Sequence, residues 1–134
     1  MKRLFFFLSL TVFATSTIAA GTNEIKSESM FNALLADNNG FIVIKFAADW
    51  CGACQAVKKT FEDIAENKDF SNVTFYTINI DTLPELTKKY NIIGVPTFIF
   101  IHNKKEIKRE SGIKNSNTFE KEFTNNLKAL LSKL

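Results

Sequence analysis

The sequence has few of the side chains that bind metal ions. Among its 134 residues there are only two cysteines, Cys51 and Cys54, and a single histidine, His102. A closed zinc site needs about three or more protein ligands, and His102 falls at the far end of a predicted strand. We therefore expect no metal site. The cysteine pair could still exchange electrons, serve as a ligand pair in a binding protein, or form a structural disulfide.

Internal repeats and Pro/Gly/Ser-rich linkers are also missing. At 134 residues the chain is long enough for one compact domain and too short for two. Hydrophobic residues make up 46% and charged residues 23% of the chain, as in ordinary globular proteins. No flavin or nicotinamide motif is present. A redox function would therefore use no cofactor beyond the cysteine pair, and its electrons would be exchanged with another protein.

The first twenty residues differ from the rest of the chain. Lys2 and Arg3 precede an apolar run at residues 4–14, and the segment ends on the small residues Ala19 and Ala20. This order is typical of a secretory signal peptide. We therefore expect residues 1–20 to be a leader cleaved after Ala19 or Ala20, and the protein to be periplasmic. The alternative is an uncleaved anchor facing the periplasm, for which the apolar run is short, since a span needs about 20 apolar residues.

Clustered positive charge is absent from the expected mature chain. Removing Lys2 and Arg3 with the leader lowers the formal net charge from +3 to +1. A nucleic-acid or anionic-membrane surface would need Lys and Arg gathered on one face. We therefore expect no nucleic-acid partner, and contact with a membrane only if the leader is retained.

The remaining residues, 21–134, predict one α/β domain. Apolar or alternating runs predict strands at residues 41–47, 73–80, 97–102 and 106–111. Helical spacing predicts helices that begin at Ser27 or Ser29, at Cys51, at Pro84 and near Asn117. No strand can be assigned before residue 27. The first two strands bracket a helix and should be parallel, whereas the last two should form an antiparallel hairpin. The result is a mixed central sheet with helices on both faces.

The position of the cysteines favours redox chemistry. Cys51 lies where a buried strand ends and a helix begins, so backbone N–H groups and the positive helix end should face its sulfur. This setting favours the thiolate and makes Cys51 the expected nucleophile. Cys54, one turn further on, should be more buried and should resolve a mixed disulfide on Cys51. A purely structural role is weaker, because such a short loop constrains the unfolded chain very little.

The motif WCGAC at residues 50–54, after a buried strand, resembles the signature of the thioredoxin superfamily. The motif GVPT at residues 94–97 lies where that family carries its cis-proline, and Gly112 lies at the expected end of the terminal hairpin. The resemblance covers about residues 25–134 and implies the thioredoxin fold. It further implies a cis Val95–Pro96 bond beside the sulfurs, with a docking surface formed by Trp50, Gly52, Ala53, Val95 and Pro96.

Three departures from the family pattern stand out. Ala53 replaces the usual proline between the cysteines, and the run ADWC is similar to the C-terminal domain of DsbD-type carriers. Lys45 stands where the family buries an acid near the resolving cysteine, and Thr77 stands where its lysine partner would be. Lys45 could stabilise the Cys54 thiolate, could itself be shifted towards the neutral amine by burial, or could extend its ammonium to solvent. Lys59 replaces a common proline, so we expect a straighter helix there.

The sequence thus predicts a thiol–disulfide oxidoreductase that uses Cys51 and Cys54. We favour a reductase or electron relay over a periplasmic dithiol oxidase. The expected partners are protein thiols and disulfides and an upstream protein that donates or accepts electrons. The alternative from a different class is a non-catalytic binding protein or metal chaperone that uses the cysteines as ligands.

Overall fold

The computed structural model describes residues 21–134, and the predicted leader at residues 1–20 lies outside the described residues. The strands are β1 (Thr22–Glu24), β2 (Phe41–Ala47), β3 (Val73–Asn79), β4 (Thr97–His102) and β5 (Lys105–Ser111). The helices are α1 (Glu28–Asp37), α2 (Gly52–Ala56), α3 (Lys58–Glu66), the 3-10 turn η1 (Lys68–Phe70), α4 (Pro84–Lys89) and α5 (Phe119–Leu131).

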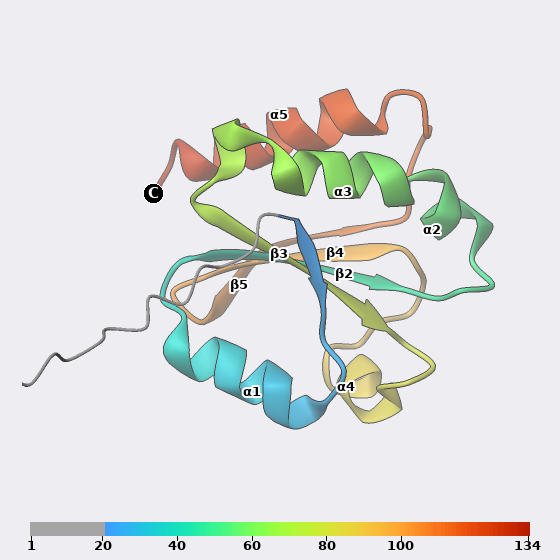
Figure 1. Ribbon diagram of the computed structural model, residues 1–134. Helices are drawn as coiled ribbons and strands as arrows, with labels where there is room; N and C mark the ends of the chain where they lie inside the picture. The colour runs from blue at the N-terminus through green and yellow to red at the C-terminus, as the bar shows by residue number, and fades with distance from the viewer. Residues whose placement is uncertain (1–20) are drawn as a thin grey trace, which may run out of the picture.

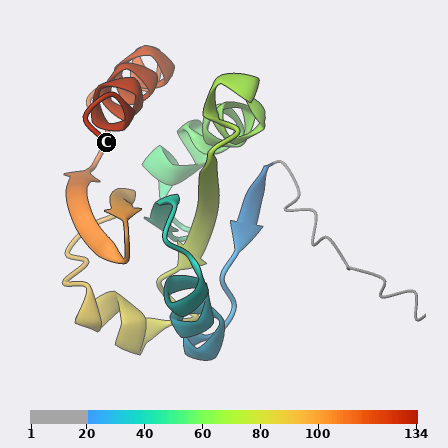
Figure 2. The same ribbon diagram turned by 90° about the vertical axis from the view of Figure 1, so that its left-hand side faces the viewer.

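The strands form one mixed sheet in the order β1-β3-β2-β4-β5. β2 pairs in parallel with β3 and antiparallel with β4, which in turn pairs antiparallel with β5. The helices form two layers, with α2, α3 and α5 over one face of the sheet and α1 and α4 over the other (Figures 1 and 2). The predicted α/β class and thioredoxin fold are therefore confirmed.

Two hydrophobic clusters hold these layers together. Side chains alternate between the faces of a strand, so Phe41 and Val43 of β2 join the cluster that includes α3 and α5, while Ile42, Ile44 and Phe46 join the cluster that includes α1 and α4. Both faces of β2 are covered, which explains why its sequence is nearly all apolar. The one charged residue of this strand, Lys45, therefore lies on the buried face beneath α3.

Local sequence signals predicted most of the helices and strands correctly. Ser27 caps α1 by accepting a hydrogen bond from the Met30 N–H, and Pro84 occupies the first turn of α4. The edge strand β1 is the element that the sequence did not reveal. It has only three residues, without an apolar pattern, and its position is fixed by parallel pairing with β3 and by the fully buried Ile25 that follows it.

The prediction of a straighter helix after the cysteines is wrong. The helix is divided at Val57, whose backbone leaves helical geometry at φ −110° and ψ 3° although no proline is present. Val57 is β-branched, which restricts its side chain in a helix, and that side chain is completely buried in the cluster under α3 and α5. Tertiary packing, rather than a proline, accounts for the break.

None of the helices within residues 21–134 combines the length and apolar character needed to cross a membrane.

Candidate active site

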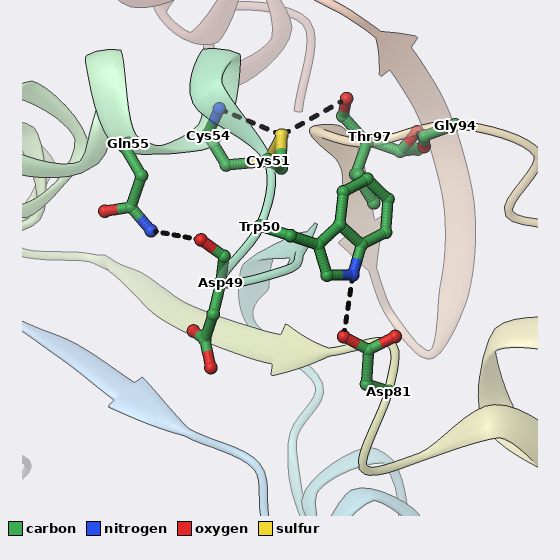
Figure 3. The surroundings of a disulfide bond; sticks show 9 residues. Asp49, Trp50, Cys51, Cys54, Gln55, Asp81, Gly94 and Thr97 are labelled. Atoms are coloured by element: carbon green, nitrogen blue, oxygen red, sulfur yellow. Dashed lines mark hydrogen bonds between the residues drawn. A yellow bond between two sulfur atoms is a disulfide. The ribbon is translucent and has the colours of Figure 1, made fainter.

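The two cysteines lie just beyond the end of β2, as predicted. Cys51 is the N-cap of α2, and its Sγ accepts a hydrogen bond of 3.0 Å from the Cys54 N–H (Figure 3). The two residues form a disulfide. Both are buried, Cys54 slightly more than Cys51. After reduction, the same N–H would stabilise a thiolate on Cys51, because a charged acceptor strengthens the hydrogen bond.

Residues 94–96, just before β4, lie beside the cysteine pair. The Val95–Pro96 peptide bond is cis, as the resemblance implied, and the Val95 carbonyl oxygen lies 3.6 Å from Cys51 Sγ. Buried Thr97 fixes this segment, because its hydroxyl donates a 2.7 Å hydrogen bond to the Gly94 carbonyl. Val95 is half-buried and Pro96 is buried. The backbone of Val95 is therefore presented directly beside the nucleophilic sulfur.

Gly112, directly after β5, supports the same segment. Its N–H donates a 2.7 Å hydrogen bond to the Pro96 carbonyl, and its φ of +74° lies in the left-handed region that favours glycine. The position that the sequence marked as the end of the hairpin is thus also a support for the Pro96 backbone.

Exposed residues surround the cysteines. Trp50 is 69% exposed, and its indole Nε1 donates a 2.9 Å hydrogen bond to a carboxylate oxygen of Asp81 (Figure 3). Gly52 and Ala53, between the cysteines, are also exposed. Trp50 is therefore a surface residue rather than a core residue. Its bond to Asp81 holds the ring beside the site.

Two residues of this surface are not marked by any motif in the sequence. Asp81 pairs with Trp50 only because β3 lies beside β2. Ile93 directly precedes Gly94 and is a fully exposed apolar residue. The only available signal for Ile93 was an apolar pair directly before a glycine.

Lys45 is buried rather than extended to solvent. The residue is 4% exposed, and it faces Thr77 across the β2–β3 ladder, as the alignment with the family had suggested. Its Nζ lies 4.8 Å from the centroid of the Phe61 ring. The reading in which the ammonium reaches bulk solvent is wrong, because α3 covers this face of β2 and Phe61 lies against the side chain.

The surroundings of Lys45 disfavour its charged form. Burial lowers the pKa of Lys45 below the usual lysine value of 10.5; the negative charge of Glu62 opposes this shift, and the positive charge of Lys58 adds to it. Lys45 and Cys54 both line a cavity of about 310 Å³. The structure therefore places a buried amine and the resolving cysteine on the lining of the same cavity.

Within residues 21–134, no group of three or more His, Cys, Asp or Glu side chains is arranged to hold a metal ion. His102 pairs with Phe41 at the start of β2, whereas the cysteines follow the end of that strand. The single histidine therefore lies at the opposite end of β2 from the cysteine pair.

This fold, with a cysteine pair at a strand-to-helix junction facing a cis-proline, defines a thioredoxin-like protein. The family model described as Thioredoxin matches residues 22–125, and the chain belongs to the thioredoxin family.

Several known proteins are similar to part of this chain or to its fold. A peptide-N(4)-(N-acetyl-beta-glucosaminyl)asparagine amidase from Caenorhabditis elegans is 35% identical over 86 residues, 63% of this chain and 14% of the amidase. Thioredoxin H2 from Arabidopsis thaliana is 32% identical over 80 residues, 60% of this chain and 59% of that protein. The chain thus spans only part of the length of either relative. The structure of a poplar thioredoxin h mutant, 19% identical with a TM-score of 0.75 over 86% of each chain, shows the shared fold.

Proposed function

We propose that this protein reduces disulfide bonds in other proteins. The observation that supports this function best is the position of Cys51 Sγ, which accepts a hydrogen bond from the Cys54 N–H and lies beside the Val95 carbonyl. An extended substrate segment can pair with an exposed backbone segment such as the one around Val95. The exposed side chains of Trp50 and Ile93 would contact the residues around the substrate cysteine.

The proposed reaction transfers two electrons in two exchanges. The Cys51 thiolate attacks one sulfur of the substrate disulfide, which forms a mixed disulfide and releases the other substrate sulfur as a thiolate that takes up a proton. The Cys54 thiolate then attacks Cys51 Sγ, which restores the Cys51–Cys54 disulfide and releases the second substrate thiol. A dithiol on an upstream protein donor would return the pair to its reduced form.

Two observations support reduction rather than oxidation. The connection between β3 and β4 contains only the short helix α4, which leaves no room for the inserted helical domain of DsbA-type oxidases. The comparisons also include proteins named as thioredoxins. The similarity of the ADWC run to DsbD-type carriers would make this protein one step of an electron relay, and that finer assignment is part of the proposal.

The equilibrium reduction potential of the Cys51–Cys54 pair tests the direction. Thioredoxin has a potential of about −270 mV and the oxidase DsbA about −120 mV. We expect a value below about −230 mV, measured by equilibration with defined ratios of reduced and oxidised dithiothreitol or glutathione. A potential near that of DsbA, together with rapid oxidation of a reduced unfolded protein, would instead establish the dithiol oxidase.

We also propose that the protein works in the periplasm after removal of residues 1–20. The charged, apolar and small-residue order of that segment supports export. Sequencing the N-terminus of the protein recovered from a periplasmic extract should give a chain that begins at Ala20 or Gly21. Recovery of the chain from the membrane fraction with Met1 still present would indicate the membrane-anchored alternative.

A further inference from the structure

Lys45 is buried without a polar partner. Within residues 21–134, its ammonium group forms no hydrogen bond or ion pair. It lies over the aromatic ring of Phe61. An unpaired charge in such a place is costly. A lysine that can lose its proton avoids this cost, because the neutral amine is far easier to bury.

The cavity beside Lys45 connects it with the redox pair. Lys45 reaches the cavity from β2 and Cys54 reaches it from α2. Its volume of about 310 Å³ exceeds the roughly 30 Å³ that one water molecule occupies. Polar side chains, among them Thr77 and Asn79 of β3, also line it. The cavity can therefore hold water between the amine and the thiol.

Other charged groups face the same cavity. They are Glu24 from β1, Asp49 after β2, and Lys58 and Glu62 from α3; β3 and β4 place the uncharged Thr77 and Phe98 opposite Lys45. Glu24 lies 3.9 Å from Lys26, and Asp49 accepts a hydrogen bond from Asn79. Glu62 is the carboxylate whose charge acts on Lys45, and it is half-buried.

We propose that Lys45, as a neutral amine, accepts the proton of the Cys54 thiol when Cys54 resolves the mixed disulfide. This inference rests on the proposed thiol–disulfide exchange and adds a proton-transfer residue to it. The resulting ammonium, held near Glu62, stabilises the Cys54 thiolate during its attack on Cys51 Sγ.

The proton and electron balance closes within the site. The Cys54 thiol and the Lys45 amine become a thiolate and an ammonium, directly or through water. The thiolate attacks Cys51 Sγ, the bond from Cys51 to the partner sulfur breaks, and the departing thiolate carries away the electron pair. Lys45 then passes its proton through the cavity to the solvent or to the departing thiolate, and the amine is restored.

The test uses a small disulfide, so that it does not depend on the physiological substrate. Reduced protein is mixed with 5,5′-dithiobis(2-nitrobenzoate), which places a thionitrobenzoate on Cys51. The second release of coloured thionitrobenzoate anion then reports the attack by Cys54. We expect Lys45→Met to slow this second release at least about tenfold at neutral pH and to move the midpoint of its pH profile up by about one unit or more.

The two profiles should converge at high pH, where the Cys54 thiol ionises without help. Lys121→Met serves as the control, since Lys121 is exposed on α5 and does not line the cavity. Its profile should stay within about twofold of the parent, and Lys45→Gln should repeat the shift of Lys45→Met. Identical profiles for Lys45→Met and the parent would overturn the proposal, as would an equal slowing at every pH. The probe is a small molecule rather than a protein. The role of Lys45 can therefore be judged even if the protein fails to reduce protein disulfides.

Discussion

Replacing Cys51 with serine is expected to lower the reduction of insulin disulfides by this protein to the uncatalysed rate. The serine hydroxyl is not ionised at neutral pH and cannot replace the thiolate that attacks the substrate disulfide. Activity is measured as the precipitation of the insulin B chain with dithiothreitol as the electron donor, in parallel for the parent and for Cys51→Ser. An unchanged rate for Cys51→Ser would remove the cysteine pair from the mechanism and favour the binding-protein class.

Cys54→Ser provides the matched control, because it removes the second thiol and keeps the first. Cys51 should still attack a substrate disulfide, but resolution should be blocked, so that the mixed disulfide accumulates. Mass spectrometry of the non-reduced reaction mixture should detect this adduct with Cys54→Ser and none with Cys51→Ser. The opposite pattern would exchange the roles that the structure gives to the N-cap sulfur and the more buried sulfur.

Replacing Lys45 with methionine is expected to stabilise the oxidised protein by about 1 kcal/mol or more at neutral pH, since a difference of one pKa unit corresponds to about 1.4 kcal/mol. The physical reason is that burial lowers the pKa of Lys45. The folded parent must either bury an ammonium group or give up its proton, and the variant avoids both costs. The free energy of unfolding is measured by urea titration of both proteins.

The gain in stability from Lys45→Met should decrease as the pH rises. Between the lowered pKa and the usual value of 10.5, the unfolded parent binds more protons than the folded parent, so the stability of the parent rises with pH. The advantage of Lys45→Met should therefore shrink from about pH 7 towards about pH 10. Lys121→Met, at an exposed position of α5, controls for the added methionine and should show no such trend. A constant difference at all pH values would show that repacking, rather than the charge, causes the gain.

Lys45 is therefore expected to speed the resolution of mixed disulfides and to lower the stability of the folded protein. If both expectations hold, the methionine variant is more stable and resolves mixed disulfides more slowly. A group that costs folding energy but serves a reaction is a common feature of active sites. The separate experiments on unfolding and on thionitrobenzoate release distinguish these two effects.

Most of the fold could be predicted because its signals are local. The buried run of β2, the cap at Ser27 and the proline of α4 each act within one element. The three-residue β1 carries no comparable signal, since only its pairing with β3 defines it. The break at Val57 was also hidden, because it results from burial under α3 and α5 rather than from a proline.

In the candidate site, too, short motifs reveal some residues and only the tertiary structure reveals the others. Cys51, Cys54 and the Val95–Pro96 segment could be identified from two short motifs, and the structure brings them together. Asp81 could not be identified, because its place beside Trp50 depends on the pairing of β3 with β2. The full exposure of Ile93 could not be predicted either, because it depends on which elements pack nearby. Neither residue belongs to a motif.

The sequence by itself determined the α/β class, the cysteine pair at a strand-to-helix junction, and the unusual lysine in the central strand. These features follow from residue type and spacing, which act over a few residues. Only the tertiary structure decided whether Lys45 reaches solvent. That outcome depends on α3 covering β2 and on the Phe61 ring lying over the side chain. Whether a long side chain can extend to water is decided by the elements packed on top of it, and these come from distant parts of the chain.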